Sequence, residues 1–132
     1  MNSRHLKKYR IPNKHRFREL YSFAMQYRDF KEELQSVSFL GSIQDGEVKG
    51  STPGDPTGRI AIEQADLISK VNLIEQCARD ADPTIWKSVL LAVTTPNITY
   101  NYLSQNHFLY CGRDKFYVAR QKFYWLLDKR KP

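Results

Sequence analysis

The sequence predicts an all-α protein, with a helical N-terminal arm followed by a C-terminal helix-turn-helix module. Apolar residues recur every three to four positions over most of the chain, and no segment shows the alternation of a β-strand. Five of the six glycines, together with two prolines, fall within residues 41–58. We therefore expect 41–58 to be a linker or loop between an N-terminal segment, 1–40, and a helical module, 59–132.

In the N-terminal segment we expect one helix over residues 14–36, with Asn13 as its N-cap. Two neighbouring apolar stripes run along it, formed by Phe17, Leu20, Phe23, Ala24, Tyr27, Phe30, Leu34 and Val37. So broad an aromatic face requires a cover. The cover is either the C-terminal module or a second copy of the chain, which would make helix 14–36 the interface of a homodimer.

Four helices are expected in the module, over residues 59–79, 83–93, 100–105 and 112–129. Asp82-Pro83 is a typical helix start, and Thr99 is expected to cap the short third helix. The buried face of the first helix is expected to contain Ile60, Leu67, Ile68, Val71, Ile74 and Ala78. That of the last helix is expected to contain Phe116, Ala119, Phe123, Leu126 and Leu127. Three helices in this order, of about eleven residues, of about six residues and, after a turn, a long basic one, indicate a helix-turn-helix unit.

The net charge of +7 conceals two basic ends and an acidic middle. Residues 1–18 carry seven basic side chains and no acidic one. Residues 19–111 have a net charge of −5, and residues 112–132 have a net charge of +5. Basic clusters of this kind indicate an anionic partner, for which we expect double-stranded DNA.

The last helix, 112–127, is expected to read the DNA with the face opposite its apolar side. The candidate DNA-binding residues on that face are Arg113, Lys115, Tyr117, Val118, Gln121 and Lys122. Arginine and lysine bind guanine or phosphate, glutamine binds adenine, and Val118 or Tyr117 suits a thymine methyl group. The basic arm, residues 4–18, is expected to add phosphate contacts.

Several classes of protein are disfavoured by the sequence. No apolar run is long enough to span a membrane, and no signal peptide is expected at the N-terminus, so we expect a cytoplasmic protein without membrane contact. The three histidines are scattered, and the glycines do not form a phosphate-binding loop. We therefore expect no enzymatic activity, no metal and no cofactor. Cys77 and Cys111 are expected to be reduced, buried thiols.

Three segments carry a resemblance to a known family. They are Asp55-Pro-Thr-Gly-Arg-Ile-Ala-Ile62, Leu73-Ile-Glu-Gln-Cys-Ala-Arg-Asp-Ala-Asp-Pro83 and Cys111-Gly-Arg-Asp-Lys-Phe-Tyr-Val-Ala-Arg-Gln-Lys-Phe-Tyr-Trp-Leu-Leu127. They resemble the RinA/ArpU-type late transcriptional regulators of phages and prophages in Gram-positive bacteria. The resemblance covers about 27–130 and implies a DNA-binding region like region 4 of sigma factors, with helix 112–127 as the DNA reader. It also implies RNA polymerase as a further partner, inside a bacterial host cell.

Two alternatives remain open. One is a DNA-packaging protein similar to a small terminase subunit, which would use the same helix-turn-helix within a ring of many subunits. The other is a helical protein-interaction module without DNA affinity, docking through aromatic faces. Substituting Arg113 and Lys115 by alanine separates the last alternative from the others, because only DNA binding requires those cations.

Overall fold

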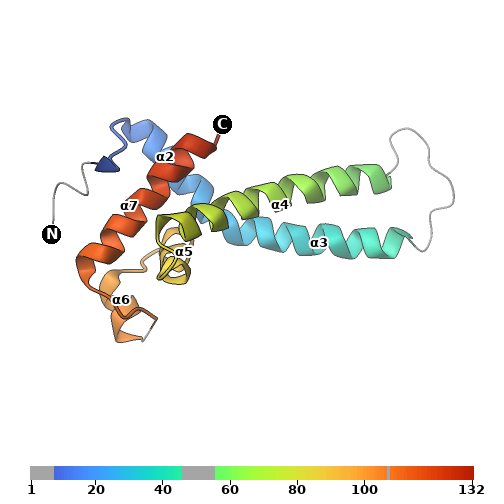
Figure 1. The fold of residues 1–132 in the computed structure, drawn as a ribbon. Coiled ribbons are helices and arrows are strands. Elements are labelled where there is room, and N and C mark those ends of the chain that lie inside the picture. The colour runs from blue at the N-terminus through green and yellow to red at the C-terminus, as the bar shows by residue number, and fades with distance from the viewer. Residues whose placement is uncertain (1–7, 46–55, 107) are drawn as a thin grey trace. The chain divides into compact units, whose positions relative to one another are not determined.

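The computed structural model describes residues 8–45, 56–106 and 108–132. These residues contain no strand, which confirms the all-α prediction. Six helices have their bounds within them: α2 (Lys14–Met25), α3 (Tyr27–Asp45), α4 (Pro56–Ala81), α5 (Trp86–Thr94), α6 (Tyr100–Gln105) and α7 (Arg113–Arg130) (Figure 1). Over the described residues, no helix is both long and apolar enough to cross a membrane.

The chain divides into two compact units. The described residues of Met1–Gln26 and Leu73–Pro132 form the first unit, and Tyr27–Asn72 form the second. The division falls within α4, so this helix contributes residues to both units.

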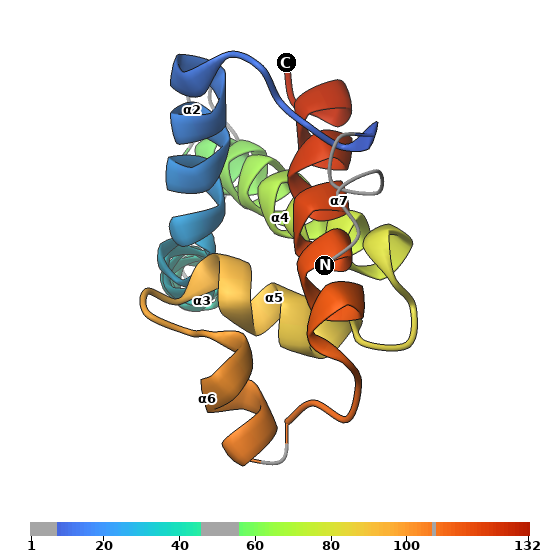
Figure 2. The ribbon, with the colours of Figure 1, turned by 90° about the vertical axis from the view of Figure 1, so that its left-hand side faces the viewer.

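The core of the first unit is built from α2, α5, α7 and the last turns of α4. Helix α2 packs on α7, and α5 packs against both, lying across one end of the pair (Figure 2). The side chains with no exposed surface there are Leu20, Ala24, Ile74, Cys77, Ala78, Val89, Val93, Leu103, Phe116, Phe123 and Leu127. Leu20 and Ala24 of α2 are therefore covered by their own chain, whereas Phe17 on the same face is 37% exposed.

A cluster at the start of α7 joins α5, α6 and α7. Ala92, Leu103, Leu109 and Phe116 are buried at its centre. Six half-buried side chains pack around them: Ile85, Leu91, Ile98, Tyr100, Cys111 and Tyr117. This cluster fixes the short helix α6 and the segment after it beside the N-terminal end of α7.

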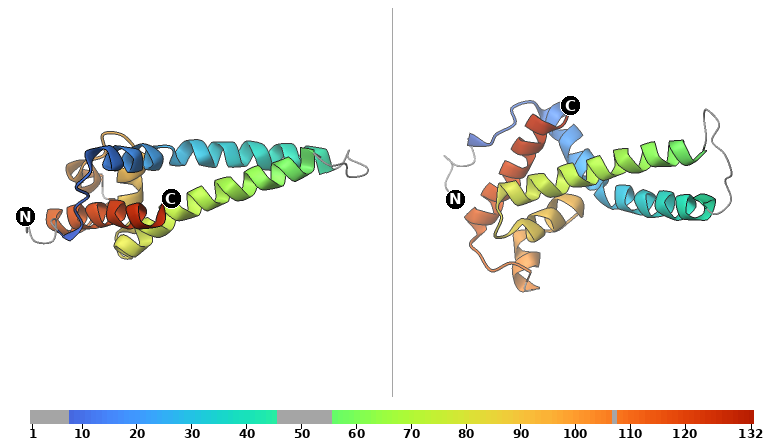
Figure 3. Two further views of the ribbon diagram at one scale, coloured as in Figure 1. Left: turned by 90° about the horizontal axis from the view of Figure 1, so that it is seen from above. Right: turned by 45° about the vertical axis from the view of Figure 1, so that its right-hand side comes forward.

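In the second unit, α3 and the first part of α4 run antiparallel, side by side (Figure 3). Tyr27 and Phe30 of α3 are buried, as are Leu67 and Val71 of α4. The Nζ atom of Lys70 lies 5.2 Å from the centre of the Phe30 ring. A cation at this distance from an aromatic face is attracted to it.

The prediction of a single helix over residues 14–36 is wrong. The chain forms two helices that are separated at Gln26, and the second continues to Asp45. The backbone N–H of Gln26 bonds to the carbonyl of Phe23, and its side-chain amide donates to the carbonyl of Ser22 at 3.2 Å. These bonds satisfy carbonyl groups at the end of α2, so the break occurs without glycine or proline.

The prediction of a loop over residues 41–58 is wrong at both ends. Residues 41–45 belong to α3, and α4 begins at Pro56, so both edges of the expected loop are helical. The rest of the expected loop, 46–55, lies outside the described residues. Pro56 occupies the first position of α4, where proline is well tolerated. A single glycine within a helix, such as Gly58, costs only about 1 kcal/mol.

Other boundaries differ less. Helix α5 begins at Trp86 instead of residue 83, because Asp82 caps a turn first: its Oδ1 atom accepts from the backbone N–H of Thr84 at 2.9 Å and from its hydroxyl at 2.6 Å. In α4 the expected core residue Ile68 is 41% exposed. The caps at Asn13 and Thr99 are confirmed, as is the buried face of α7, apart from the half-buried Leu126.

Candidate nucleic-acid interface

The charge of the chain follows its two units. Residues 1–26 and 73–132 contain sixteen basic and six acidic side chains, a net charge of +10. Residues 27–72 contain five basic and eight acidic side chains, a net charge of −3. The positive potential that attracts an anionic partner therefore belongs to the first unit.

The N-terminal end of α7 is the part of this unit where unpaired donors and cations meet. Gly112 occupies the N-cap position and provides no side-chain cap. The first N–H groups of a helix have no partner within the helix and carry partial positive charge. Arg113 and Lys115 are exposed in this first turn, while Phe116 is fully buried and anchors the turn to the core.

Arg113 is held in place by α6. Its Nη2 atom donates to Oδ1 of Asn101 at 3.0 Å, and its guanidinium lies 5.2 Å from the centre of the Tyr100 ring. The hydroxyl of Tyr100 in turn donates to the carbonyl of Cys111 at 2.7 Å. The guanidinium of Arg113 thus contacts a neutral amide and a ring, neither of which neutralises its positive charge.

The other candidate DNA-binding residues of α7 are less accessible. Tyr117 and Val118 are half-buried, and the Tyr117 ring packs edge-on at 5.1 Å from that of Phe116. The Oε1 atom of Gln121 is buried and has no hydrogen-bond partner among the described residues. As the structure stands, this oxygen is not presented to a base edge. The first turn is therefore the most accessible part of the expected reading face.

Lys122 lies next to a segment that the sequence did not associate with α7. Residues 8–13 run from the start of α2 to α7 (Figure 2). The ring of Tyr9 lies edge-on to Trp125 with 5.3 Å between centroids, and the Nζ atom of Lys122 lies 5.7 Å from the Tyr9 ring. This contact was missed because two aromatic residues far apart in sequence give no local signal of their pairing.

One cation of the basic arm has an internal role. The Nε atom of Arg16 donates to Asp128 Oδ1 at 2.7 Å, and its Nη2 atom donates to the carbonyls of Asp128 and Lys131 at 3.1 and 2.9 Å. The hydrogen bond to Asp128 raises the pKa of Arg16 above its ordinary value. Arg16 therefore joins the start of α2 to the end of α7 and is not available to phosphate. The remaining described cations of the arm, Lys8, Arg10, Lys14 and Arg18, are exposed.

The end of α7 makes a second internal ion pair. Arg130 lies 2.8 Å from Asp80 of α4, and its Nη1 atom lies 4.0 Å from the sulfur of Cys77. Burial raises the pKa of Cys77 to about 11, in spite of the nearby guanidinium. This thiol is fully buried, as expected, and is almost entirely protonated at neutral pH. Cys111 is only half-buried, which corrects the prediction for that residue.

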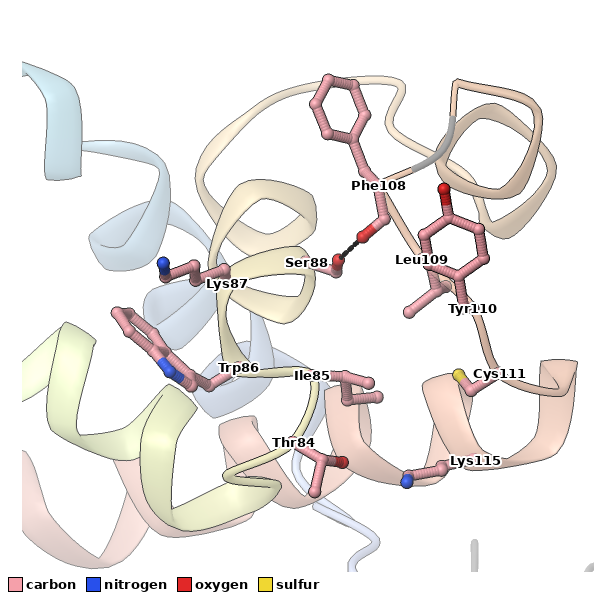
Figure 4. A pocket seen from close by; sticks show the side chains of 10 residues that line it. All are labelled: Thr84, Ile85, Trp86, Lys87, Ser88, Phe108, Leu109, Tyr110, Cys111 and Lys115. Carbon is pink, nitrogen blue, oxygen red and sulfur yellow. Dashed lines mark hydrogen bonds between the residues drawn. The ribbon is translucent and has the colours of Figure 1, made fainter.

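A pocket of about 480 Å³ lies between the start of α5 and the segment before α7 (Figure 4). It is lined by Thr84, Ile85, Trp86, Lys87, Ser88, Phe108, Leu109, Tyr110, Cys111 and Lys115. Lys87 and Lys115 lie on opposite sides of it in Figure 4. The residues that the structure describes hold no group of three or more histidine, cysteine or acidic side chains suited to a metal ion.

Comparisons with protein families, with curated proteins and with solved structures find no match to this chain.

Proposed function

We propose that this protein is a sequence-specific double-stranded DNA-binding regulator of transcription, which contacts DNA through its first unit. The observation that carries the proposal is the net charge of +10 on this unit, beside −3 on the second. A duplex presents one phosphate charge about every 1.7 Å, so such a unit is attracted to it before any base is read.

The first turns of α7 are the proposed contact with the bases. Arg113 and Lys115 are exposed there, and an arginine or lysine in the major groove binds the O6 and N7 atoms of guanine. The hydrogen bond from Arg113 to Asn101 fixes the direction of the guanidinium, which lowers the entropy lost on binding. Under this proposal α5, α6 and α7 act as a helix-turn-helix unit with α7 as the recognition helix.

The segment before α2 is the proposed phosphate-binding part. Lys8, Arg10, Lys14 and Arg18 are exposed, and the contact between Tyr9 and Trp125 keeps this segment beside the recognition helix. Contacts of this kind add affinity for every sequence and set the register of the protein on the duplex.

The biological setting that we propose follows the family resemblance. The segment 111–127 resembles the late regulators of phages and prophages, and such a regulator binds a promoter and cooperates with RNA polymerase. A role in regulating phage or prophage genes in a bacterial host is therefore part of the proposal.

The test is selection of bound sequences from a random duplex pool at 50 and 200 mM salt. We expect an enriched motif, and a loss of affinity of about 10³-fold or more between the two salt concentrations if six to eight cations contact phosphates. Lys31→Ala, in the acidic second unit, is the control that should leave affinity nearly unchanged. Binding without an enriched motif would favour the packaging alternative, and no binding at 50 mM would contradict the proposal.

A further inference from the structure

Two aromatic rings are displayed on the segment that precedes α7. Phe108 is 57% exposed and Tyr110 is 83% exposed, whereas Leu109 between them is 4% exposed and belongs to the core. Leu109 anchors this segment in the core, and the rings on either side of it remain exposed to solvent. Figure 4 shows the two rings on the side of the segment away from Leu109.

The backbone that displays these rings is held at several points. The hydroxyl of Ser88 donates to the carbonyl of Phe108 at 2.6 Å, and the backbone N–H of Phe108 donates to the carbonyl of Leu103 at 2.9 Å. The hydroxyl of Tyr100 holds the carbonyl of Cys111 at 2.7 Å. Because the backbone is already fixed, little further backbone entropy is lost when the rings bind a flat partner.

The surroundings of the rings are basic. Both line the pocket that also contains Lys87 and Lys115, whose side chains are exposed, and the pocket lies in the unit with net charge +10. Aromatic faces beside cations are the chemistry that binds single-stranded nucleic acid: bases stack on the rings while the cations bind the phosphates. The paired bases of a regular duplex are already stacked on each other, so only unpaired bases offer their faces.

We propose that Phe108 and Tyr110 form a stacking site for unpaired bases of DNA, with Lys87 binding the phosphates of the same strand. The site takes a locally opened or distorted strand next to the duplex that α7 binds. It rests on the proposed function, because it requires DNA to reach the N-terminal end of α7. The positive charge around the rings favours this polyanion over an apolar protein surface.

The experiment compares two probes of one sequence: a fully paired duplex, and the same duplex with four central bases unpaired. Full-length wild type is titrated with each probe. The variants Tyr110→Leu and Tyr110→Trp, which have the same net charge as wild type, are titrated in the same way. We expect wild type to bind the opened duplex roughly 5- to 100-fold more tightly than the paired one. Tyr110→Leu should abolish most of that preference, and Tyr110→Trp should retain it because the ring is kept.

Tyr21→Leu is the matched control, because it removes an exposed ring of α2 and should leave the preference intact. Thermal unfolding of each variant verifies that the fold is kept. Equal affinity of wild type for both probes, or an equal loss on both probes in Tyr110→Leu, would overturn the stacking site while leaving the proposed function standing. Failure of wild type to bind either probe would overturn both the stacking site and the proposed function.

Discussion

The two ends of α7 are equally basic in sequence and differ in what surrounds their charges. At the C-terminal end, Arg130 pairs with Asp80, Lys129 lies 4.3 Å from the Trp125 ring, and the last carbonyls accept bonds from Arg16. At the N-terminal end, Arg113 bonds to an amide and Lys115 is exposed.

The surroundings of each cation decide whether its charge is neutralised within the fold or remains available to a partner. A guanidinium paired with a carboxylate leaves no net charge for a partner, and an exposed pair such as Arg130 and Asp80 stabilises the fold by about 1 kcal/mol or less. A guanidinium held by a neutral amide keeps its full charge and is pre-positioned. Under the proposed function, the C-terminal end of α7 contributes to stability and the N-terminal end to binding.

The largest expected effect concerns the core beneath the N-terminal end. Phe116→Ala removes a fully buried ring from the α5–α6–α7 cluster and should lower the free energy of unfolding by about 3–5 kcal/mol. Urea denaturation measures it, with Tyr102→Ala, which truncates a 44% exposed ring of α6, as the control expected to cost less than about 1 kcal/mol. Similar costs for both variants would show that the N-terminal end has no packed support.

A smaller effect is expected at the C-terminal end. Arg16→Met removes the hydrogen bonds to Asp128 and Lys131 and should lower the free energy of unfolding by about 1–2 kcal/mol. DNA affinity, measured under conditions where the variant is folded, should stay near that of wild type. Arg18→Met, at an exposed position, is the control for stability. A loss of DNA affinity in Arg16→Met larger than in Arg18→Met would break the division between the two ends.

The smallest effect concerns a buried phenol in the C-terminal half of α7. The hydroxyl of Tyr124 has no hydrogen-bond partner among the described residues, and burial raises the pKa of Tyr124 to about 12, from an ordinary value near 10. The neutral phenol is therefore favoured in the folded state. Its contribution is complete below pH 10 and is lost as the pH rises towards 12.

Tyr124→Phe removes this titration. Between pH 9 and pH 11, wild type should lose about 1 kcal/mol more of its free energy of unfolding than the variant does. At pH 7 the two proteins should differ in stability by about 1 kcal/mol or less, because the phenol is neutral there in both the folded and the unfolded state. Parallel stability curves for the two proteins up to pH 11 would mean that the phenol is not shielded from solvent.

Much of the fold was predictable because its signals are local. Asn13 and Thr99 cap their helices through bonds that reach only two or three residues along the chain. Spacing alone identified four buried residues of α7, Phe116, Ala119, Phe123 and Leu127, and missed Tyr124. The break at Gln26 was not predictable, because its residues have ordinary helix propensity and the apolar stripes continue through it. What differs is the unit to which each side of the break belongs, and that is a tertiary property.

The candidate site was predictable in part for the same reason. The polar first turn of α7 follows from helical spacing, and Arg113 and Lys115 are exposed as expected. The partners of Arg16, more than a hundred residues away in sequence, leave no trace in the local pattern. The exposed position of Tyr110 depends on hydrogen bonds from Ser88 and Tyr100 to the backbone carbonyls of Phe108 and Cys111. Every residue type has such a carbonyl, so the sequence of the segment does not reveal these bonds.

The most direct test of the central claim compares DNA affinity in two double variants of matched charge. Arg113→Ala with Lys115→Ala, and Lys129→Ala with Lys131→Ala, each remove two positive charges, from opposite ends of α7. On a selected duplex at fixed salt, we expect the first pair to weaken binding by roughly 30- to 1,000-fold and the second by only a few fold. Equal losses would contradict the claim, because they would mean that DNA responds to total charge and not to the N-terminal end of α7.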